Sequence, residues 1–132
     1  MWPNVMRLYA RTYLKKEFGI EGYEFLGLER LKSSRAAGHG IMLAPNHCRP
    51  CDPMVLGLMT SKISLPLFTM ASWHLFMQGK FQAWLLPRLG GFSVYREGLD
   101  REALKCAVQI LVDAKRPLVI FPEGAISRTN DR

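Results

Sequence analysis

A histidine and an aspartate, five positions apart, are the residues best suited to catalysis. His47 and Asp52 lie in the segment Asn-His-Cys-Arg-Pro-Cys-Asp (46–52), which follows a short apolar run. The imidazole side chain has an ordinary pKa of about 6.5, so a histidine can accept a proton at neutral pH. A carboxylate at the following helix start can turn back, hold the other ring nitrogen and stabilise the imidazolium. The pair is therefore a candidate general base with its orienting partner; the alternative is a structural loop histidine beside a helix cap.

The same segment contains two cysteines, which open a second kind of chemistry. Cys48-Arg-Pro-Cys51 matches the C-x-P-C pattern of thiol–disulfide exchange. Redox motifs place the first cysteine at a helix N-terminus. Here Asp52 and Pro53 predict that the helix starts after the second cysteine, Cys51, which argues against a redox motif. A zinc site is weaker still, because the remaining ligands would have to come from scattered histidines (His39, His47, His74). We expect no bound metal.

Two more polar segments also follow apolar runs. In Gly-Gly-Phe-Ser-Val-Tyr-Arg (90–96), Arg96 ends a short expected strand, where a guanidinium can bind phosphate oxygens or remain a solvated surface charge. In Phe-Pro-Glu-Gly (121–124), Glu123 follows an all-apolar run. Ligands of open α/β sheets gather beyond the carboxyl ends of the strands. We therefore expect His47, Arg96 and Glu123 to meet at one edge of a sheet.

Strands and helices are predicted to alternate along the chain, which favours an α/β fold with a mostly parallel sheet covered by helices. The run 118–121 is all apolar, as in strands covered on both faces, and so few residues follow it that we expect the sheet to be incomplete at the C-terminus. The expected strands are 23–28, 41–44, 65–70, 92–95 and 118–121; the expected helices are 2–18, 53–60, 73–86 (one or two helices) and 101–114, capped by Asp100; and 32–40 is expected to be a loop.

Composition limits the class of protein and of partner. The 132 residues allow one domain, and 48% hydrophobic residues exclude a disordered chain. The longest apolar stretch, 54–72, is interrupted by Lys62 and Pro66 and fails as a membrane span. The net charge of +7 indicates an anionic partner. Since there is no run of like charges, we expect a phosphorylated substrate or a membrane surface and no nucleic acid.

Two segments could reach a membrane or a lipid. Helix 2–18 alternates aromatic and basic residues, and it either packs on the domain or lies at a bilayer surface. Segment 73–86 is rich in aromatic and large aliphatic residues, which either line a groove for an acyl chain or form core. The N-terminus lacks the pattern of a secretory signal, so the expected location is cytoplasmic.

Taken together, the segments 46–52, 90–96 and 121–124 resemble the first three motif blocks of the glycerolipid acyltransferases, the lysophosphatidate acyltransferase family, over about residues 22–128. The resemblance implies an acyltransferase-like fold over 21–132, preceded by an amphipathic helix (1–20). The family's fourth block, an apolar strand containing proline, is missing, so we expect a truncated, N-terminal fragment. The implied roles are catalytic base for His47, its orienting partner for Asp52, and acceptor binding for the remaining site residues (Arg96 on the phosphate, with Gly91, Glu123 and Gly124).

The resemblance also implies a reaction. A fatty acyl group would pass from acyl-CoA or acyl-carrier protein to the free hydroxyl of lysophosphatidate, or of a related glycerophospholipid, in phospholipid biosynthesis. No cofactor is expected beyond this acyl thioester, and the protein would associate peripherally with the cytoplasmic face of a membrane. Two alternatives stay open: a catalytically inactive membrane- or phosphate-binding fragment, and a thiol oxidoreductase using Cys48 and Cys51.

Overall fold

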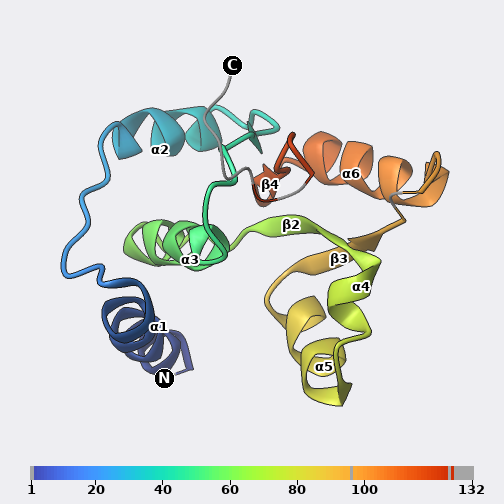
Figure 1. The fold of residues 1–132 in the computed structure, drawn as a ribbon. Helices are drawn as coiled ribbons and strands as arrows, with labels where there is room; N and C mark the ends of the chain where they lie inside the picture. Colours follow the sequence, from blue (N-terminus) through green and yellow to red (C-terminus); the bar gives the residue numbers. More distant parts are fainter. Residues whose placement is uncertain (1, 96, 125, 127–132) are drawn as a thin grey trace.

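The computed structural model describes residues 2–95, 97–124 and 126 (Figure 1). Within them, after the first two helices, each strand is followed by one or two helices before the next strand, in line with the alternation that the sequence predicts from 41 onward. The elements in chain order are α1 (Trp2–Phe18), α2 (Leu28–Ala36), β1 (Met42–Leu43), α3 (Asp52–Lys62), β2 (Phe68–Ser72), α4 (Trp73–Phe76), α5 (Lys80–Arg88), β3 (Gly91–Val94), α6 (Arg101–Asp113) and β4 (Leu118–Val119).

In the part of the chain that the structure describes, four parallel strands form one sheet in the order β1-β4-β2-β3. The sheet and its helices confirm the predicted α/β fold. Leu118 and Val119 are adjacent in β4 and therefore face opposite sides of the sheet, yet both are fully buried. This central strand is thus covered on both faces, which explains why its sequence is apolar without alternation.

Two apolar clusters stabilise the fold. In the first, Ala107 and Ile110 of α6 pack on Leu118 of β4. In the second, Leu14 of α1 packs against Leu58 of α3 and the residue before that helix, Cys51. Helix α1 therefore packs on the rest of the chain through Leu14. Figure 1 shows α1 beside α3. None of the described helices is long and apolar enough to cross a membrane.

The strand expected at 23–28 and the loop expected at 32–40 are both wrong. Tyr23 and Phe25 lie in an irregular segment and pack on the cluster around Leu14, with the Lys62 ammonium 5.7 and 5.5 Å from their ring centroids. These aromatic side chains are partly buried by packing on that cluster, so the segment needs no neighbouring strand to cover them. Helix α2 covers much of the expected loop, because its polar residues are mainly straight-chain helix formers; none of them is buried.

Other boundaries move by a few residues. Strand β2 begins at Phe68, three residues later than expected, because Pro66 has no N–H to donate to a ladder. The first ladder bond joins the Phe68 amide to the Pro117 carbonyl oxygen at 2.8 Å. The aromatic segment 73–86 is two helices, α4 and α5, interrupted at Gly79, whose φ is 153°. Helix α6 matches its prediction, with Asp100 as its N-cap.

A glycine pair aligns β3 with its neighbours. Gly90 has a φ of 89°, and a Cβ at this position would collide with the carbonyl oxygen of Leu67. Its own carbonyl accepts a hydrogen bond from the Thr69 amide at 2.9 Å, next to the start of the β2–β3 pairing. A Cβ on Gly91 would lie 3.0 Å from the Leu86 carbonyl oxygen of α5. Gly90 is therefore required by its backbone conformation and by close backbone approach, and the space at Gly91 is tight for any side chain.

Candidate active site

The loop that joins β1 to α3 holds the histidine–aspartate pair. His47 Nδ1 lies 3.1 Å from Asp52 Oδ2, and the two side chains are only 18% and 23% exposed. The same carboxylate oxygen accepts hydrogen bonds from the amides of Cys48 at 2.8 Å and Arg49 at 2.9 Å. Since an ionised carboxylate only accepts hydrogen bonds, Nδ1 must carry the proton that it shares with Asp52. In the neutral imidazole, Nε2 then keeps its lone pair and can accept a proton.

The start of α3 differs from the expectation in one respect. Cys51 is the N-cap and Asp52 is the first helical residue, so Pro53 is the second. The Asp52 side chain turns back to the amides of Cys48 and Arg49, which precede the helix. A carboxylate in the first turn also interacts favourably with the positive end of the helix dipole. Asp52 therefore shapes the loop as well as holding the imidazole.

The turn after β4 brings Glu123 to the histidine. Pro122 follows Phe121, and the Gly124 amide donates to the Phe121 carbonyl at 3.0 Å, which closes a tight turn. Glu123 Oε2 accepts a hydrogen bond from the His47 backbone amide at 2.7 Å. Two loops that are far apart in sequence are thereby joined at one edge of the sheet.

Phe121 is a site residue that sequence reasoning missed. Its ring centroid lies 4.3 Å from that of the His47 imidazole, with the planes inclined by 32°. The contact limits the orientations that the imidazole can adopt. Its position in the sequence could have indicated this contact, because Phe121 ends the apolar run and directly precedes the Pro-Glu-Gly turn.

Arg96 lies outside the described residues. The residues on either side of it in the chain have defined partners: the Tyr95 amide donates to Asp100 Oδ2 at 2.9 Å, and Trp73 Nε1 donates to Glu97 Oε2 at 3.2 Å. The amides of Ala103 and Tyr95 lower the pKa of Asp100, because their hydrogen bonds favour the ionised carboxylate.

Gly91 lies in the sheet, level with Leu43 and Val119, which are the last residues of β1 and β4. His47 and Glu123 follow those two residues four positions later in the chain. Its close approach to α5 accounts for a glycine here. Gly124 ends the turn that carries Glu123, with a φ of 65°. Acceptor binding by either glycine stays a prediction.

The comparison with protein families decides what these residues belong to. The sequence profile of the acyltransferase family, described as Acyltransferase, matches residues 23–132. This chain belongs to the acyltransferase family. The matched range contains the sheet, the His47–Asp52 loop and the Glu123 turn, and it begins after α1. No match was found among curated proteins or among solved structures.

One of the two cysteines of the C-x-P-C segment, Cys51, is poorly placed for thiol chemistry in this acyltransferase. Cys51 is buried against Leu14 and Leu58. Burial raises the pKa of its thiol, and the neighbouring Asp52 carboxylate raises it further, so the reactive thiolate is disfavoured. Cys48 is exposed, and both cysteines are free. In the part of the chain that the structure describes, no group of three or more His, Cys, Asp or Glu side chains could hold a metal ion.

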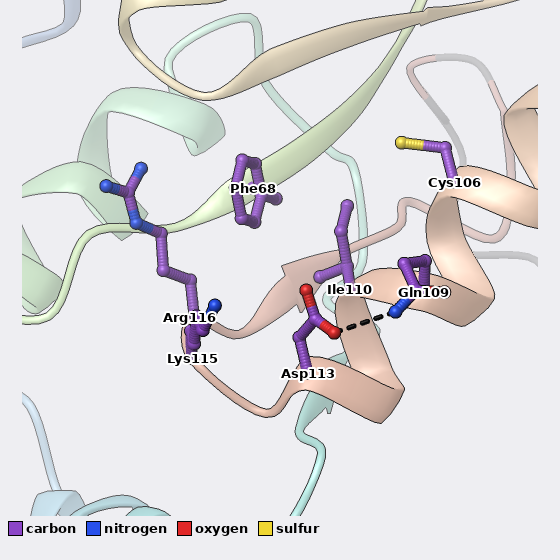
Figure 2. A pocket seen from close by; sticks show the side chains of 7 residues that line it. All are labelled: Phe68, Cys106, Gln109, Ile110, Asp113, Lys115 and Arg116. Carbon is purple, nitrogen blue, oxygen red and sulfur yellow. Dashed lines mark hydrogen bonds between the residues drawn. The ribbon is translucent and has the colours of Figure 1, made fainter.

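A cavity of about 410 Å³ lies against α6 in this acyltransferase (Figure 2). His47 is not among the residues that line it. Phe68 begins β2 and Arg116 precedes β4, so the cavity opens at the amino ends of the strands, whereas His47 and Glu123 follow the carboxyl ends. The Arg116 guanidinium lies 5.2 Å from the Phe68 ring centroid. The cavity contains none of the predicted site residues; it is lined by Phe68, Cys106, Gln109, Ile110, Asp113, Lys115 and Arg116.

The hydrogen bond from Glu123 to the His47 amide yields a prediction for this acyltransferase. Glu123→Ala removes the acceptor that joins the two loops, so we expect turnover to fall by about tenfold to a hundredfold through misplacement of the imidazole. Glu123→Gln keeps an oxygen that can accept from the same amide, and we expect it to retain most of the activity. The measurement is kcat for both variants. Equal losses in Ala and Gln would show that the negative charge of Glu123 matters and not its link to the loop.

Proposed function

We propose that this acyltransferase transfers a fatty acyl group from an acyl thioester, acyl-CoA or acyl-carrier protein, to the free hydroxyl of lysophosphatidate or a related glycerophospholipid. His47 is the general base. The observation that carries the proposal is the His47–Asp52 hydrogen bond, which leaves Nε2 as a proton acceptor. The link between the His47 amide and Glu123 supports it, because it holds the loop in place.

The reaction needs no covalent enzyme intermediate. Nε2 of His47 removes the proton of the acceptor hydroxyl as its oxygen attacks the thioester carbonyl carbon. The tetrahedral intermediate collapses, the carbon–sulfur bond breaks, and an ester forms. The imidazolium then returns its proton to the departing thiolate, so the products are the ester and a free thiol. Asp52 stabilises the imidazolium between these steps.

The charge of the chain supports a phosphorylated acceptor. The net charge is +7, and an arginine such as Arg96 can bind phosphate oxygens with two parallel hydrogen bonds. In this proposal Arg96 binds the acceptor phosphate, while Glu123 and Gly124 shape the acceptor site. Because the acceptor is a lipid, the enzyme works at a membrane surface, for which we propose the cytoplasmic face.

Thiol release from acyl-CoA, with and without lysophosphatidate, tests the proposed reaction directly. We expect release that depends on the acceptor and is matched by formation of the diacyl product. Monoacylglycerol, which lacks the phosphate, is the control acceptor. Release that is the same without any acceptor would indicate a thioesterase and would contradict the proposal.

Replacing Arg96 tests the choice of acceptor. Arg96→Ala should raise the KM for lysophosphatidate by about tenfold to a hundredfold, the range expected for losing hydrogen bonds to a charged group. The KM for monoacylglycerol should change little, because that acceptor has no phosphate. Arg35→Ala, in the exposed helix α2, is the control for loss of one positive charge. Equal effects on both acceptors would remove Arg96 from the phosphate site.

A further inference from the structure

The helical hairpin formed by α4 and α5, residues 73–88, presents large apolar side chains to solvent. In α5, Phe81 and Trp84 are 65% and 47% exposed, and their rings stack with centroids 6.3 Å apart. Their spacing, continued by Arg88, places them on one face of the helix. Leu75 and Met77 add exposed apolar surface at the end of α4 and just after it. Figure 1 shows the hairpin standing away from α6 and α3.

The other face of α5 already has its partner. Leu85 and Leu86 are half-buried, and the Leu86 backbone lies against Gly91 of β3. The outward aromatic face is therefore additional to the packing that holds the hairpin on the sheet. An exposed cluster of this kind on a folded domain marks an interaction surface.

The charges around the hairpin identify the partner. The hairpin itself, residues 73–88, contains two basic residues, Lys80 and Arg88, and no aspartate or glutamate. The acidic residue that contacts it is Glu97, which lies against Trp73 and His74 of α4, and these two residues precede α5 in the chain. The Arg88 guanidinium lies 4.3 Å from the Trp84 ring centroid and donates to the Trp84 carbonyl at 2.7 Å. Helix α5 thus has aromatic rings beside cations and no acidic residue, which is complementary to a bilayer with anionic headgroups.

We infer that the α4–α5 hairpin inserts Phe81 and Trp84 into the interface of an anionic lipid bilayer, with Lys80 and Arg88 at the level of the lipid phosphates. Helix α4 starts directly after Ser72, the last residue of β2, at the sheet edge where His47 and Glu123 follow β1 and β4. Insertion thus brings this edge to the membrane. The inference rests on the proposed function in that a lipid acceptor requires such contact.

Helix α6 supplies a matched control surface. Leu104, Val108 and Val112 form an equally exposed apolar stripe on it, but α6 also contains Glu102 and Asp113. The outward faces of α5 and α6 therefore expose similar apolar side chains, but only α6 contains acidic residues. If the inference is correct, only the hairpin contributes to membrane binding.

Vesicle sedimentation tests the inference. The probe is phosphatidylcholine vesicles containing one part in three, or no, phosphatidylglycerol. The double variant Phe81→Gln/Trp84→Gln should bind the anionic vesicles about tenfold to a hundredfold more weakly. Lys80→Gln should weaken binding to anionic vesicles by about fivefold and leave neutral vesicles unaffected. The control double variant Leu104→Gln/Val108→Gln should bind like the wild type, and an equal loss there would overturn the inference.

Fluorescence provides a measurement that does not depend on weakened binding. Vesicles with brominated acyl chains should quench part of the tryptophan emission of the wild type, and Trp84→Phe should remove that quenched part while binding persists. Quenching that survives in Trp84→Phe would overturn insertion of this residue.

The two proposals fail differently. If the Phe81→Gln/Trp84→Gln variant binds vesicles like the wild type while a water-soluble short-chain lysophosphatidate is still acylated, the hairpin inference fails alone. If vesicles bind normally but the wild type shows no acceptor-dependent thiol release, the proposed reaction fails alone.

Discussion

His47→Ala should lower acceptor-dependent acyl transfer by at least about 10²–10⁴-fold, the usual contribution of a general base. The loss should fall on kcat, because the imidazole takes its proton in the transition state and is not needed to bind either substrate. The substitution leaves the loop's other contacts available: the backbone amide of residue 47 still donates to Glu123, and Asp52 still accepts from the amides of Cys48 and Arg49. A large loss of activity without unfolding is therefore the expected result.

Two controls make this result specific. His39→Ala removes another histidine, one whose ring contacts Ser34 at the exposed end of α2, and we expect normal turnover. Circular dichroism and thermal unfolding of both variants should resemble those of the wild type. Turnover of His47→Ala within a few-fold of the wild type would exclude a general-base role for this residue.

Asp52→Asn should slow turnover by about 10²–10⁴-fold while leaving the fold intact. In the wild type a single oxygen of Asp52 accepts three hydrogen bonds, two from backbone amides and one from His47 Nδ1. The amide oxygen of asparagine can take the same place, since those two backbone donors require an acceptor there. What asparagine lacks is the negative charge, so the imidazolium formed during catalysis loses its stabilising partner.

Asp52→Ala separates the structural role of this residue from its chemical role. Alanine leaves the amides of Cys48 and Arg49 without their acceptor, so both turnover and the melting temperature should fall. Asp52→Asn should change turnover alone. Measuring kcat and thermal unfolding for both variants distinguishes the two roles. A wild-type kcat in Asp52→Asn would show that Asp52 has only a structural role in the loop.

Elements whose start and periodicity are encoded by neighbouring residues could be predicted from the sequence. Helix α6 has its N-cap, Asp100, and an apolar stripe at helical spacing within thirteen residues, and the Asp100 side chain accepts from the Ala103 amide at 2.9 Å as a cap should. The two glycines that precede and begin β3 were equally visible in the sequence. In both cases the information lies within a few residues of the element.

Elements that depend on distant partners were not predictable in the same way. The sequence predicted a strand at 23–28, but the rings of Tyr23 and Phe25 pack instead on the cluster formed by Leu14, Cys51 and Leu58. A strand also needs a neighbour with free hydrogen-bonding groups, and a sequence pattern does not show whether one is present. Helix α2 does not depend on distant partners: it buries no residue, and it forms because its residues have high intrinsic helix propensity. The sequence analysis predicted a loop there because the segment is polar.

The candidate site likewise has one part that was predictable from local sequence and one part that depends on distant residues. His47 and Asp52 are five residues apart, so a turn of loop and the start of a helix suffice to bring them together, and their pairing could be inferred from the sequence. The hydrogen bond from the His47 amide to Glu123 joins residues 76 positions apart. It exists because β1 pairs with β4 in parallel, which puts the ends of both strands at one edge. Local spacing was enough to pair His47 with Asp52, whereas the contact between their loop and Glu123 depends on strand pairing.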